Sequence, residues 1–402
     1  MLRRPAALAL ALPLLLGGLV APATAADHDV VPRRAAAQVQ LTSWSTYADF
    51  KAGSRSGLKL GRGVVTLRDA RPRTVAGRAY EAGTWTSPWA SPGFGATSLI
   101  PTWEASTPGR SMVRVEVRAK GPDGRTGSWD TMADWSRTNR PVKRTTYSGQ
   151  PDDLGSVNVD TWTAASTITA WQVRVTLMRP KGSANAVALE RVGAVASAGE
   201  KTPRPTSTPG PSVVGTVLDV PALSQMVHTG HYPQWGGGGE AWCSATSTAM
   251  VLGYYGISPA PTGIAPGHVD AVVDHTAKMV YDHGYRGTGN WAFNTAYAAT
   301  LVAGDSYVTR MSGLREAEDY IAAGVPLVAS IAFGRGQLTG APIAASNGHL
   351  LVIVGFEADG DVVVNDPAGA TNADVRRVYD RAEFERIWIA ASGGTAYVIR
   401  NG

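Results

Sequence analysis

A proline- and threonine-rich segment at residues 197–215 divides this 402-residue chain into two parts with different sequence patterns. Its central run, KTPRPTSTPGP at 201–211, cannot build a packed core and favours an extended, semi-rigid polyproline-like spacer. Chain length favours two domains, and a hydrophobic content of 44% is enough to give each domain a core. The sequence therefore predicts an N-terminal domain at 37–196, a linker at 197–215 and a C-terminal domain at 216–402.

The first 26 residues have the pattern of a secretory signal peptide. Two arginines precede an apolar run at 6–20, and the triplet ATA at 23–25 matches a signal peptidase site. No later segment approaches the roughly 18 apolar residues that a membrane span needs. We therefore expect a secreted protein without a transmembrane span in the mature chain, either released or held at the cell wall by binding.

The charge of the chain gives little indication of its partners. The formal net charge is +5, which is small for this length, and the lysines and arginines are scattered. This distribution allows attraction to anionic cell-wall polymers, but it does not indicate nucleic-acid binding.

Residues 37–196 show no clear helical period. Apolar and polar residues alternate at 114–118 and again at 171–177, so each stretch should be a strand with one face in a core. Turn-forming sequences, GPDG at 121–124 and GQPDD at 149–153, lie between them. This pattern predicts an all-β sandwich of antiparallel strands.

Eight of the twelve tryptophans of the chain belong to this N-terminal part. They are Trp44, Trp85, Trp89, Trp103, Trp129, Trp135, Trp162 and Trp171. Packing in the core is the favoured interpretation, because tryptophan is common in strands. Stacking of the ring faces on sugars is the functional alternative.

The C-terminal part mixes helical and strand patterns. Helices are expected directly after the single cysteine and at 269–280, 290–301, 314–323 and 380–387, and a buried strand is expected at 327–332. Two apolar, β-rich runs at 349–356 and 362–366 flank an Asp-Gly turn and predict a hairpin, and a last strand is expected at 395–399. Helices first and antiparallel strands second indicate an α+β fold.

Cys243 is the only cysteine of the chain, and an unpaired thiol in an exported protein calls for a reason. Small and apolar residues follow it and predict a buried helix, so Cys243 should lie at the helix N-terminus, where unpaired N–H groups and the helix dipole favour an anion. The glycine-rich loop, which we define as QWGGGGEA at 234–241, precedes it. This arrangement suits an active site, and an inert buried thiol is the alternative.

A cysteine nucleophile needs a base, and the base needs an acceptor that orients its ring. His349 begins one strand of the predicted hairpin and Asp366 ends the other, so the hairpin should bring the two side by side. Asn365 is the alternative orienting residue, although strand alternation turns its side chain to the opposite face. The non-catalytic alternatives are a structural role for His349 and a turn-capping role for Asp366.

The other histidines indicate no further chemistry. His228 and His231 flank the glycine-rich loop and are interpreted either as exposed loop polarity or as residues that line a cleft. A second group lies on or near one predicted helix and contains Asp270, Asp274, His275 and His283. Neither group has the residue spacing of a known zinc motif, so the sequence predicts no metal site and no cofactor.

Four short motifs together resemble a known family. They are WCS at 242–244 leading into a helix, NGHLLV at 347–352, NDP at 365–367 and YDR at 379–381. In combination they resemble the secreted, actinobacterial-type branch of the bacteriocin-processing peptidase-like proteins, which belong to the papain-like superfamily of cysteine peptidases. The resemblance covers roughly residues 217–402 and implies a papain-like fold for the C-terminal domain.

The resemblance also implies roles for individual residues. It implies Cys243 as the nucleophile, His349 as the general base and then acid, and Asp366 as the orienting residue. An upstream glutamine is implied as the oxyanion donor. The segment VPALSQ at 220–225 matches the family pattern best, which makes Gln225 the candidate and Gln234 the alternative.

We therefore expect a secreted cysteine peptidase that cleaves peptide or amide bonds, with the N-terminal sandwich as a targeting or regulatory module. The sequence differs from the processing transporters of this family, because it has neither their membrane segments nor their ATPase. Two alternatives stay open: a peptidoglycan amidase or endopeptidase, and a catalytically silent cell-surface binding protein. The expected partner is a peptide or protein substrate, with cell-wall glycan or peptide as a further candidate.

Overall fold

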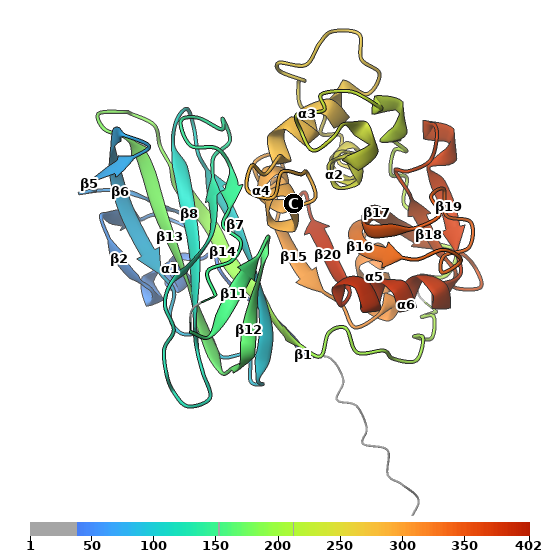
Figure 1. The fold of residues 1–402 in the computed structure, drawn as a ribbon, viewed down its shortest axis with the longest axis horizontal. Helices are drawn as coiled ribbons and strands as arrows, with labels where there is room; N and C mark the ends of the chain where they lie inside the picture. The colour runs from blue at the N-terminus through green and yellow to red at the C-terminus, as the bar shows by residue number, and fades with distance from the viewer. Residues whose placement is uncertain (1–37, 152, 212) are drawn as a thin grey trace, which may run out of the picture. The chain divides into compact units, whose positions relative to one another are not determined.

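The computed structural model describes residues 38–151, 153–211 and 213–402 (Figure 1). The signal peptide expected at 1–26 lies outside these residues. The described residues all belong to one compact unit. In the part of the chain that the structure describes, no helix is long and apolar enough to cross a membrane.

Two antiparallel sheets contain all strands of the described N-terminal part and enclose a common core (Figure 1). The first sheet has the order β11 (Gly155–Asn158), β12 (Thr161–Ile168), β7 (Ala96–Ser106), β14 (Ala188–Ala198), β4 (Val65–Leu67) and β3 (Leu58–Leu60), with β1 (Gln38–Trp44) paired to β14. The second has the order β10 (Thr145–Thr146), β9 (Asp130–Trp135), β8 (Met112–Lys120), β13 (Ala170–Pro180), β6 (Arg78–Thr86) and β2 (Ser54–Ser56), with β5 (Arg71–Val75) paired to β6. A short helix, α1 (Tyr47–Ala52), follows β1.

The two alternating stretches of the sequence are neighbouring strands, as predicted. They belong to β8 and β13, which pair antiparallel with Val115 opposite Val175 and Val117 opposite Val173. All four valines are fully buried, while Arg174, between Val173 and Val175, keeps part of its side chain exposed. The period-two pattern thus places one face of the sheet in the core.

Most of the N-terminal tryptophans are core residues, which confirms the favoured interpretation for them. The buried ones are Trp44, Trp85, Trp103, Trp135, Trp162 and Trp171. Trp44 of the first sheet makes edge-to-face contacts with Trp85 and Trp171 of the second, at centroid distances of 5.8 and 5.6 Å. Trp89 and Trp129 are half-buried, and the guanidinium of Arg118 lies over both rings, 5.2 and 4.6 Å from their centroids.

The strands after residue 300 form one antiparallel sheet (Figure 1). Its order is β15 (Ser306–Arg310), β20 (Thr395–Ile399), β16 (Leu327–Phe333), β17 (Ser346–Phe356), β18 (Val362–Asn365) and β19 (Arg376–Tyr379). The α-helices of this part are α2 (Cys243–Tyr254), α3 (Ala271–Val280), α4 (Trp291–Ala299), α5 (Leu314–Ala322) and α6 (Arg381–Ser392). Three short 3₁₀ helices are η1 (Met226–His228), η2 (Gly239–Ala241) and η3 (Asn372–Asp374).

Both faces of this sheet are buried, because helices cover each of them. Along β17, Leu350 and Val352 belong to the core shared with α2 and α4, whereas Leu351 and Ile353 belong to the core shared with α5 and α6. Burial on both faces explains why the sequence of β17 is an apolar run without alternation. The predicted hairpin is confirmed, since β17 and β18 pair antiparallel across residues 357–361.

The helix predictions hold with small changes in their ends. The helix predicted at 269–280 begins only at Ala271, and Val269 is largely exposed. The helix predicted at 380–387 continues to Ser392 as α6, with Asp380 as its N-cap, because apolar residues beyond 387 pack against the sheet. Capping residues mark the start of a helix in the sequence, but packing decides where it ends.

The proline-rich segment lies against the C-terminal part and does not stand free of it. The Ser207 backbone N–H and hydroxyl donate to the Glu385 carboxylate, and the Gly210 N–H donates to Glu318. The parts before and after this segment also touch, since the ring of Phe293 in α4 packs 6.1 Å from Trp103 and 5.2 Å from Trp135. The apolar core is therefore continuous from the sandwich strands to α4.

Candidate active site

Cys243 is the first residue of α2, as the sequence predicts. No side chain caps this helix, and its serines and threonines contact neighbouring elements instead. Ser244 hydrogen-bonds to the Tyr397 hydroxyl at 2.8 Å, and Thr248 donates to Asn294 at 2.9 Å, so both anchor the buried helix to its neighbours. The absence of a side-chain cap leaves N–H groups of the first turn available for an anion beside the half-buried thiol.

His349 and Asp366 meet as the hairpin predicts. His349 lies in β17 opposite Ile331 of β16, and Asp366 follows directly after β18. The His349 Nε2 and Asp366 Oδ1 atoms are 2.7 Å apart, and both residues are buried. The His349 ring and Cys243 line the same cavity, and the thiol lies close enough to help raise the pKa of the ring. Because Asp366 occupies Nε2, the nitrogen left for Cys243 is Nδ1.

The environment keeps His349 positively charged at neutral pH. Burial alone lowers the pKa of His349, but the Asp366 carboxylate and the hydrogen bonds to Asp366 and Cys243 outweigh it and raise this pKa to about 10. Burial raises the pKa of Asp366, but its interaction with His349 outweighs burial and lowers it overall.

These opposite shifts predict the pH dependence of the stability that the pair contributes. The raised pKa of His349 adds stability that is complete below about 6.5, its unfolded pKa, and that is lost as the pH rises through about 10. The lowered pKa of Asp366 adds stability that is present above about 3.9 and is lost as the pH falls below that value. The difference in unfolding free energy between wild type and Asp366→Asn should therefore be largest between about pH 4 and 6.5. Urea unfolding from pH 3 to 10 tests this, and a difference that is constant over that range contradicts it.

Tyr379 is a part of the site for which the sequence suggested no role. Its hydroxyl donates to Asp366 Oδ2 at 2.7 Å, while Asp366 Oδ1 accepts from His349 and from the Ala368 N–H. Burial and the Asp366 carboxylate raise the pKa of Tyr379, so its proton stays on the hydroxyl. The YDR motif contained this residue, but only the pairing of β18 with β19 shows what it contacts.

The two candidate glutamines have different environments. Gln225 is buried, lines the same cavity as Cys243 and His349, and donates from Nε2 to the Glu240 carbonyl at 2.6 Å. An amide group has two N–H donors, so one remains for a ligand. Gln234 is exposed and does not line the cavity.

Asn365, the alternative orienting residue, faces away from His349 as strand alternation predicts. Its Nδ2 donates to the carbonyls of Val220 and Pro221, and its Oδ1 accepts from Arg376. Asn365 therefore holds the segment that leads to Gln225 against β18, while its neighbour Asp366 faces the imidazole.

The glycine-rich loop brings backbone close to the glutamine segment. Gly236, Gly237 and Gly238 have φ values of 90°, 110° and 115°, which residues with a Cβ rarely adopt. A Cβ at Gly239 would lie 2.4 Å from the His228 carbonyl oxygen and 2.6 Å from that of Gln225. The glycines are thus required for the close approach of the loop, which forms part of the cavity wall.

The cavity beside Cys243 has a volume of about 1060 Å³, and both parts of the chain line it. From the N-terminal part comes Asp160, whose carboxylate accepts from the Trp291 N–H at 2.9 Å. Burial raises the pKa of Asp160 to about 6, although the hydrogen bond from Trp291 lowers it. No local pattern in the sequence connects Asp160 with Cys243, because only packing of the sandwich against α4 brings it to the cavity.

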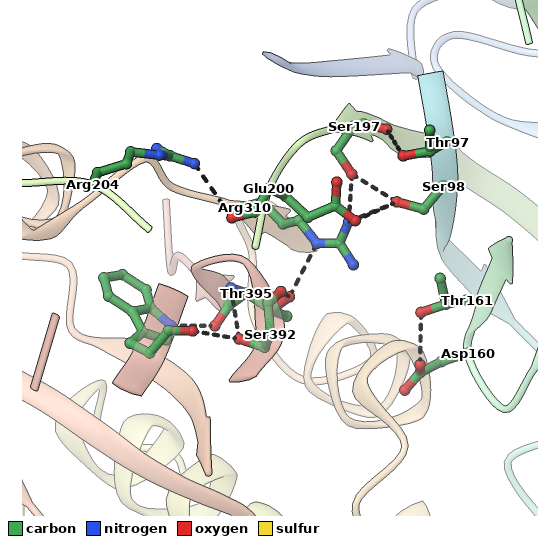
Figure 2. Close-up of polar contacts among 11 residues, drawn as sticks. Thr97, Ser98, Asp160, Thr161, Ser197, Glu200, Arg204, Arg310, Ser392 and Thr395 are labelled. Atoms are coloured by element: carbon green, nitrogen blue, oxygen red, sulfur yellow. Dashed lines mark hydrogen bonds and ion pairs between the residues drawn. The ribbon is translucent and has the colours of Figure 1, made fainter. Parts of the chain in front are cut away.

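A buried polar cluster joins the two parts of the chain at the cavity wall (Figure 2). Arg310 of β15 donates from Nη1 to Glu200 at 2.8 Å and to the Ser98 hydroxyl of β7 at 2.7 Å. Burial lowers the pKa of Arg310, although Glu200 and Asp160 oppose this, and the carboxylate of Glu200 compensates its buried charge. The cluster fixes the sandwich wall of the cavity relative to the sheet that carries His349.

A second group of ionisable side chains lies outside the cavity lining. His228 and His231, which the sequence indicates as loop polarity or cleft lining, and Asp274, which it places on a predicted helix, have potential ligand atoms within 4.8 Å of one another. Their spacing in the sequence matches no metal motif, and only the packing of α3 brings Asp274 to the two histidines.

Two family models match the chain. Residues 217–396 match the peptidase C39-like family, and residues 40–197 match the peptidase C39 N-terminal domain. No curated protein matches the chain.

Solved structures show weak likenesses. A crystal structure assigned as a C39-like peptidase from Bacillus anthracis is 18% identical, with 46% of this chain and 98% of that chain covered and a TM-score of 0.32. An infectious bursal disease virus (Gt strain) structure is 14% identical, with 44% and 36% covered and a TM-score of 0.21. A carbohydrate-binding module of the β-sandwich superfamily is 10% identical, with 39% and 54% covered and a TM-score of 0.16. TM-scores this low assign neither a fold nor a function.

A helix-borne cysteine beside a histidine, together with the family matches, defines the class: the protein is a cysteine-type peptidase. Residues 217–396 carry a peptidase C39-like domain, and together with the C39 N-terminal domain at 40–197 the two matched segments cover most of the described residues. As a peptidase it acts on a peptide or protein substrate.

Proposed function

We propose that this protein is a secreted cysteine peptidase that cleaves peptide or amide bonds with a Cys243, His349 and Asp366 triad. The observation that carries the proposal is the position of His349, which is buried, hydrogen-bonded to Asp366 and lines the same cavity as Cys243, whose thiol helps to raise the pKa of the imidazole. Tyr379 and the Ala368 N–H hold the Asp366 carboxylate, so the imidazole has a fixed orientation.

The proposed reaction is acyl transfer in two steps. The Cys243 thiolate attacks the carbonyl carbon, and the Gln225 amide and the Cys243 N–H stabilise the negative charge on the oxygen. The C–N bond then breaks as His349 gives its proton to the departing amine, which leaves an acyl group on the sulfur. His349 next takes a proton from water, and the hydroxide that forms hydrolyses the thioester and restores the thiol.

We also propose a papain-like α+β organisation for residues 216–402 and a sandwich domain at 37–196, joined by the segment 197–215. Support comes from α2, which packs with the cysteine at its N-terminus against the sheet strand that carries the histidine. Export through a signal peptide at 1–26 is a further proposal, and it rests on the sequence pattern alone.

Hydrolysis of a mixed peptide and muropeptide pool tests this function. The expected result is cleavage that stops when iodoacetamide has modified Cys243, with peptide mapping to confirm the modified residue. Alkylation at pH 6 should be faster than that of glutathione, because the His349 imidazolium lies beside the sulfur. Cleavage that survives complete alkylation, or alkylation no faster than that of glutathione, contradicts the proposed nucleophile. Cleavage of muropeptides alone would instead assign a peptidoglycan substrate.

The position of Asp160 predicts that the proposed peptidase prefers substrates with a positively charged side chain. Its carboxylate is ionised above about pH 6 and lines the cavity, where it favours a positively charged substrate group. Asp160→Asn should lower kcat/KM for peptides with a lysine or arginine by about tenfold and leave neutral peptides unchanged. Thr163→Ala, on the same wall, is the matched control. Equal losses for charged and neutral peptides would show a structural role for Asp160 instead.

A further inference from the structure

Three histidines from separate positions in the chain converge on one carboxylate. His228 ends η1, His231 follows three residues later, and His268 lies in the loop before α3. Asp274 in α3 accepts contacts from all three. The cluster lies outside the cavity lining and takes no part in the proposed acyl transfer.

The distances in this cluster suit a four-coordinate metal ion. Asp274 Oδ2 lies 2.9 Å from His228 Nδ1, and Asp274 Oδ1 lies 3.0 Å from His231 Nδ1 and 3.6 Å from His268 Nδ1. Zinc bonds to nitrogen and oxygen of about 2.0–2.2 Å place tetrahedral ligand atoms roughly 3.3 Å apart. These separations from Asp274 lie on either side of that value. The ligand atoms of His228, His231 and Asp274 also lie within 4.8 Å of one another, and His268 would complete the set by moving toward the same carboxylate.

The burial and the charge of these side chains also favour a bound metal ion. The side chains of Asp274 and His228 are both 0% exposed, and a buried carboxylate needs a compensating positive charge. Within the described residues, the ion pairs of Asp274 are with histidines and with no lysine or arginine. The Nδ1 atom of His268 is buried without a hydrogen-bond partner there, although it points to the carboxylate. The side chains of His231 and His268 are 27% and 25% exposed, which opens a route for an ion from solvent.

We propose that His228, His231, His268 and Asp274 form a structural zinc site. Imidazole nitrogens with one carboxylate oxygen are ligands that zinc accepts, and four protein ligands leave no open position for a substrate. The site therefore differs in kind from the cysteine centre: it holds chain segments together and performs no chemistry.

The proposed ion would brace the segment that carries Gln225. The His228 N–H donates to the Gln225 carbonyl at 3.1 Å, and the His231 N–H donates to the His228 carbonyl at 2.9 Å. The ring of His228 also lies 6.2 Å from that of Trp242, the residue before the cysteine. Zinc would thus connect the residues just before the glycine-rich loop to α3. This connection would limit the movement of two segments, the one that carries Gln225 and the one that leads to Cys243.

Metal analysis of the full chain, purified without a histidine tag, tests the site. We expect about one zinc ion per chain by mass spectrometry and a tetrahedral d–d absorption band when Co²⁺ replaces zinc. His231→Ala and His268→Ala should each weaken zinc binding by about 100-fold or more. EDTA should lower the melting temperature of wild type by about 5 °C or more and leave that of His231→Ala unchanged. His283→Ala, which removes a histidine that contacts Asn139 outside the cluster, should keep the metal.

Several results would overturn the proposal. They are a wild-type chain that binds no zinc and has the same melting temperature with and without EDTA, or unchanged zinc affinity in His231→Ala and His268→Ala. Cys243→Ala must also keep the metal, because loss there would place the ion on the active-site thiol. If His231→Ala does not fold, His268→Ala and the Co²⁺ spectrum of wild type decide the question, since His268 is partly exposed and lies in a loop.

Discussion

Cys243→Ala and His349→Ala are each expected to lower kcat by about 10⁴-fold or more, and the double variant should lose no more than either single variant. The reason is that the two residues act as one unit: the histidine holds the thiolate and supplies the proton, and it does neither without the sulfur. Steady-state and single-turnover hydrolysis of a peptide substrate measure the three rates.

Asp366→Asn tests the contribution of the carboxylate charge while the hydrogen bond that orients His349 is kept. The variant keeps an oxygen that can accept from His349 Nε2, but it removes the charge that raises the pKa of that ring. We expect a smaller loss than for His349→Ala, together with slower alkylation of Cys243 at pH 6. Losses in the two single variants that multiply in the double variant would contradict a shared mechanism, and circular dichroism of each variant controls for folding.

Gln225→Ala is expected to lower kcat by about 100- to 1,000-fold with little change in KM, because an oxyanion donor acts mainly in the transition state. Gln225 is buried and lines the cavity with Cys243, and one of its amide protons is already held by the Glu240 carbonyl. That hydrogen bond fixes the direction of the second N–H before substrate arrives. Pre-steady-state measurement of the acyl-enzyme burst locates the loss in the acylation step.

Gln234→Ala provides the matched control, since it removes the same chemical group from an exposed position in the neighbouring loop. We expect its kcat to be within about twofold of wild type. Gln225→Glu is a second check, because a carboxylate in the same place repels a developing oxyanion and should be no better than alanine. A large loss in Gln234→Ala with normal activity in Gln225→Ala would exchange the roles of the two glutamines.

The pairing of His349 with Asp366 could be predicted because it depends on local structure. An Asp-Gly turn between two apolar runs specifies a hairpin, and a hairpin specifies which residues lie side by side. Strand alternation likewise predicted that Asn365 faces away from His349, where it contacts the Val220 carbonyl. The start of α2 at Cys243 followed from the change between a glycine-rich loop and a buried helix.

Other features depend on contacts between residues far apart in the sequence, and no local pattern encodes those contacts. Tyr379 meets Asp366 because β19 pairs with β18, and Asp160 reaches the cavity because the sandwich packs on α4. The cluster around Asp274 needs α3 to approach the histidine-bearing loop.

The sequence by itself thus predicted the positions of Cys243, His349 and Asp366 from one helix start and one hairpin turn, and the family resemblance implied their roles. Only the tertiary structure decided which walls enclose the thiol and which glutamine shares its cavity. It alone assembled the four proposed zinc ligands. The physical reason is that side-chain periodicity and turn chemistry act over a few residues, whereas cavities and ligand sets form where separate elements pack together.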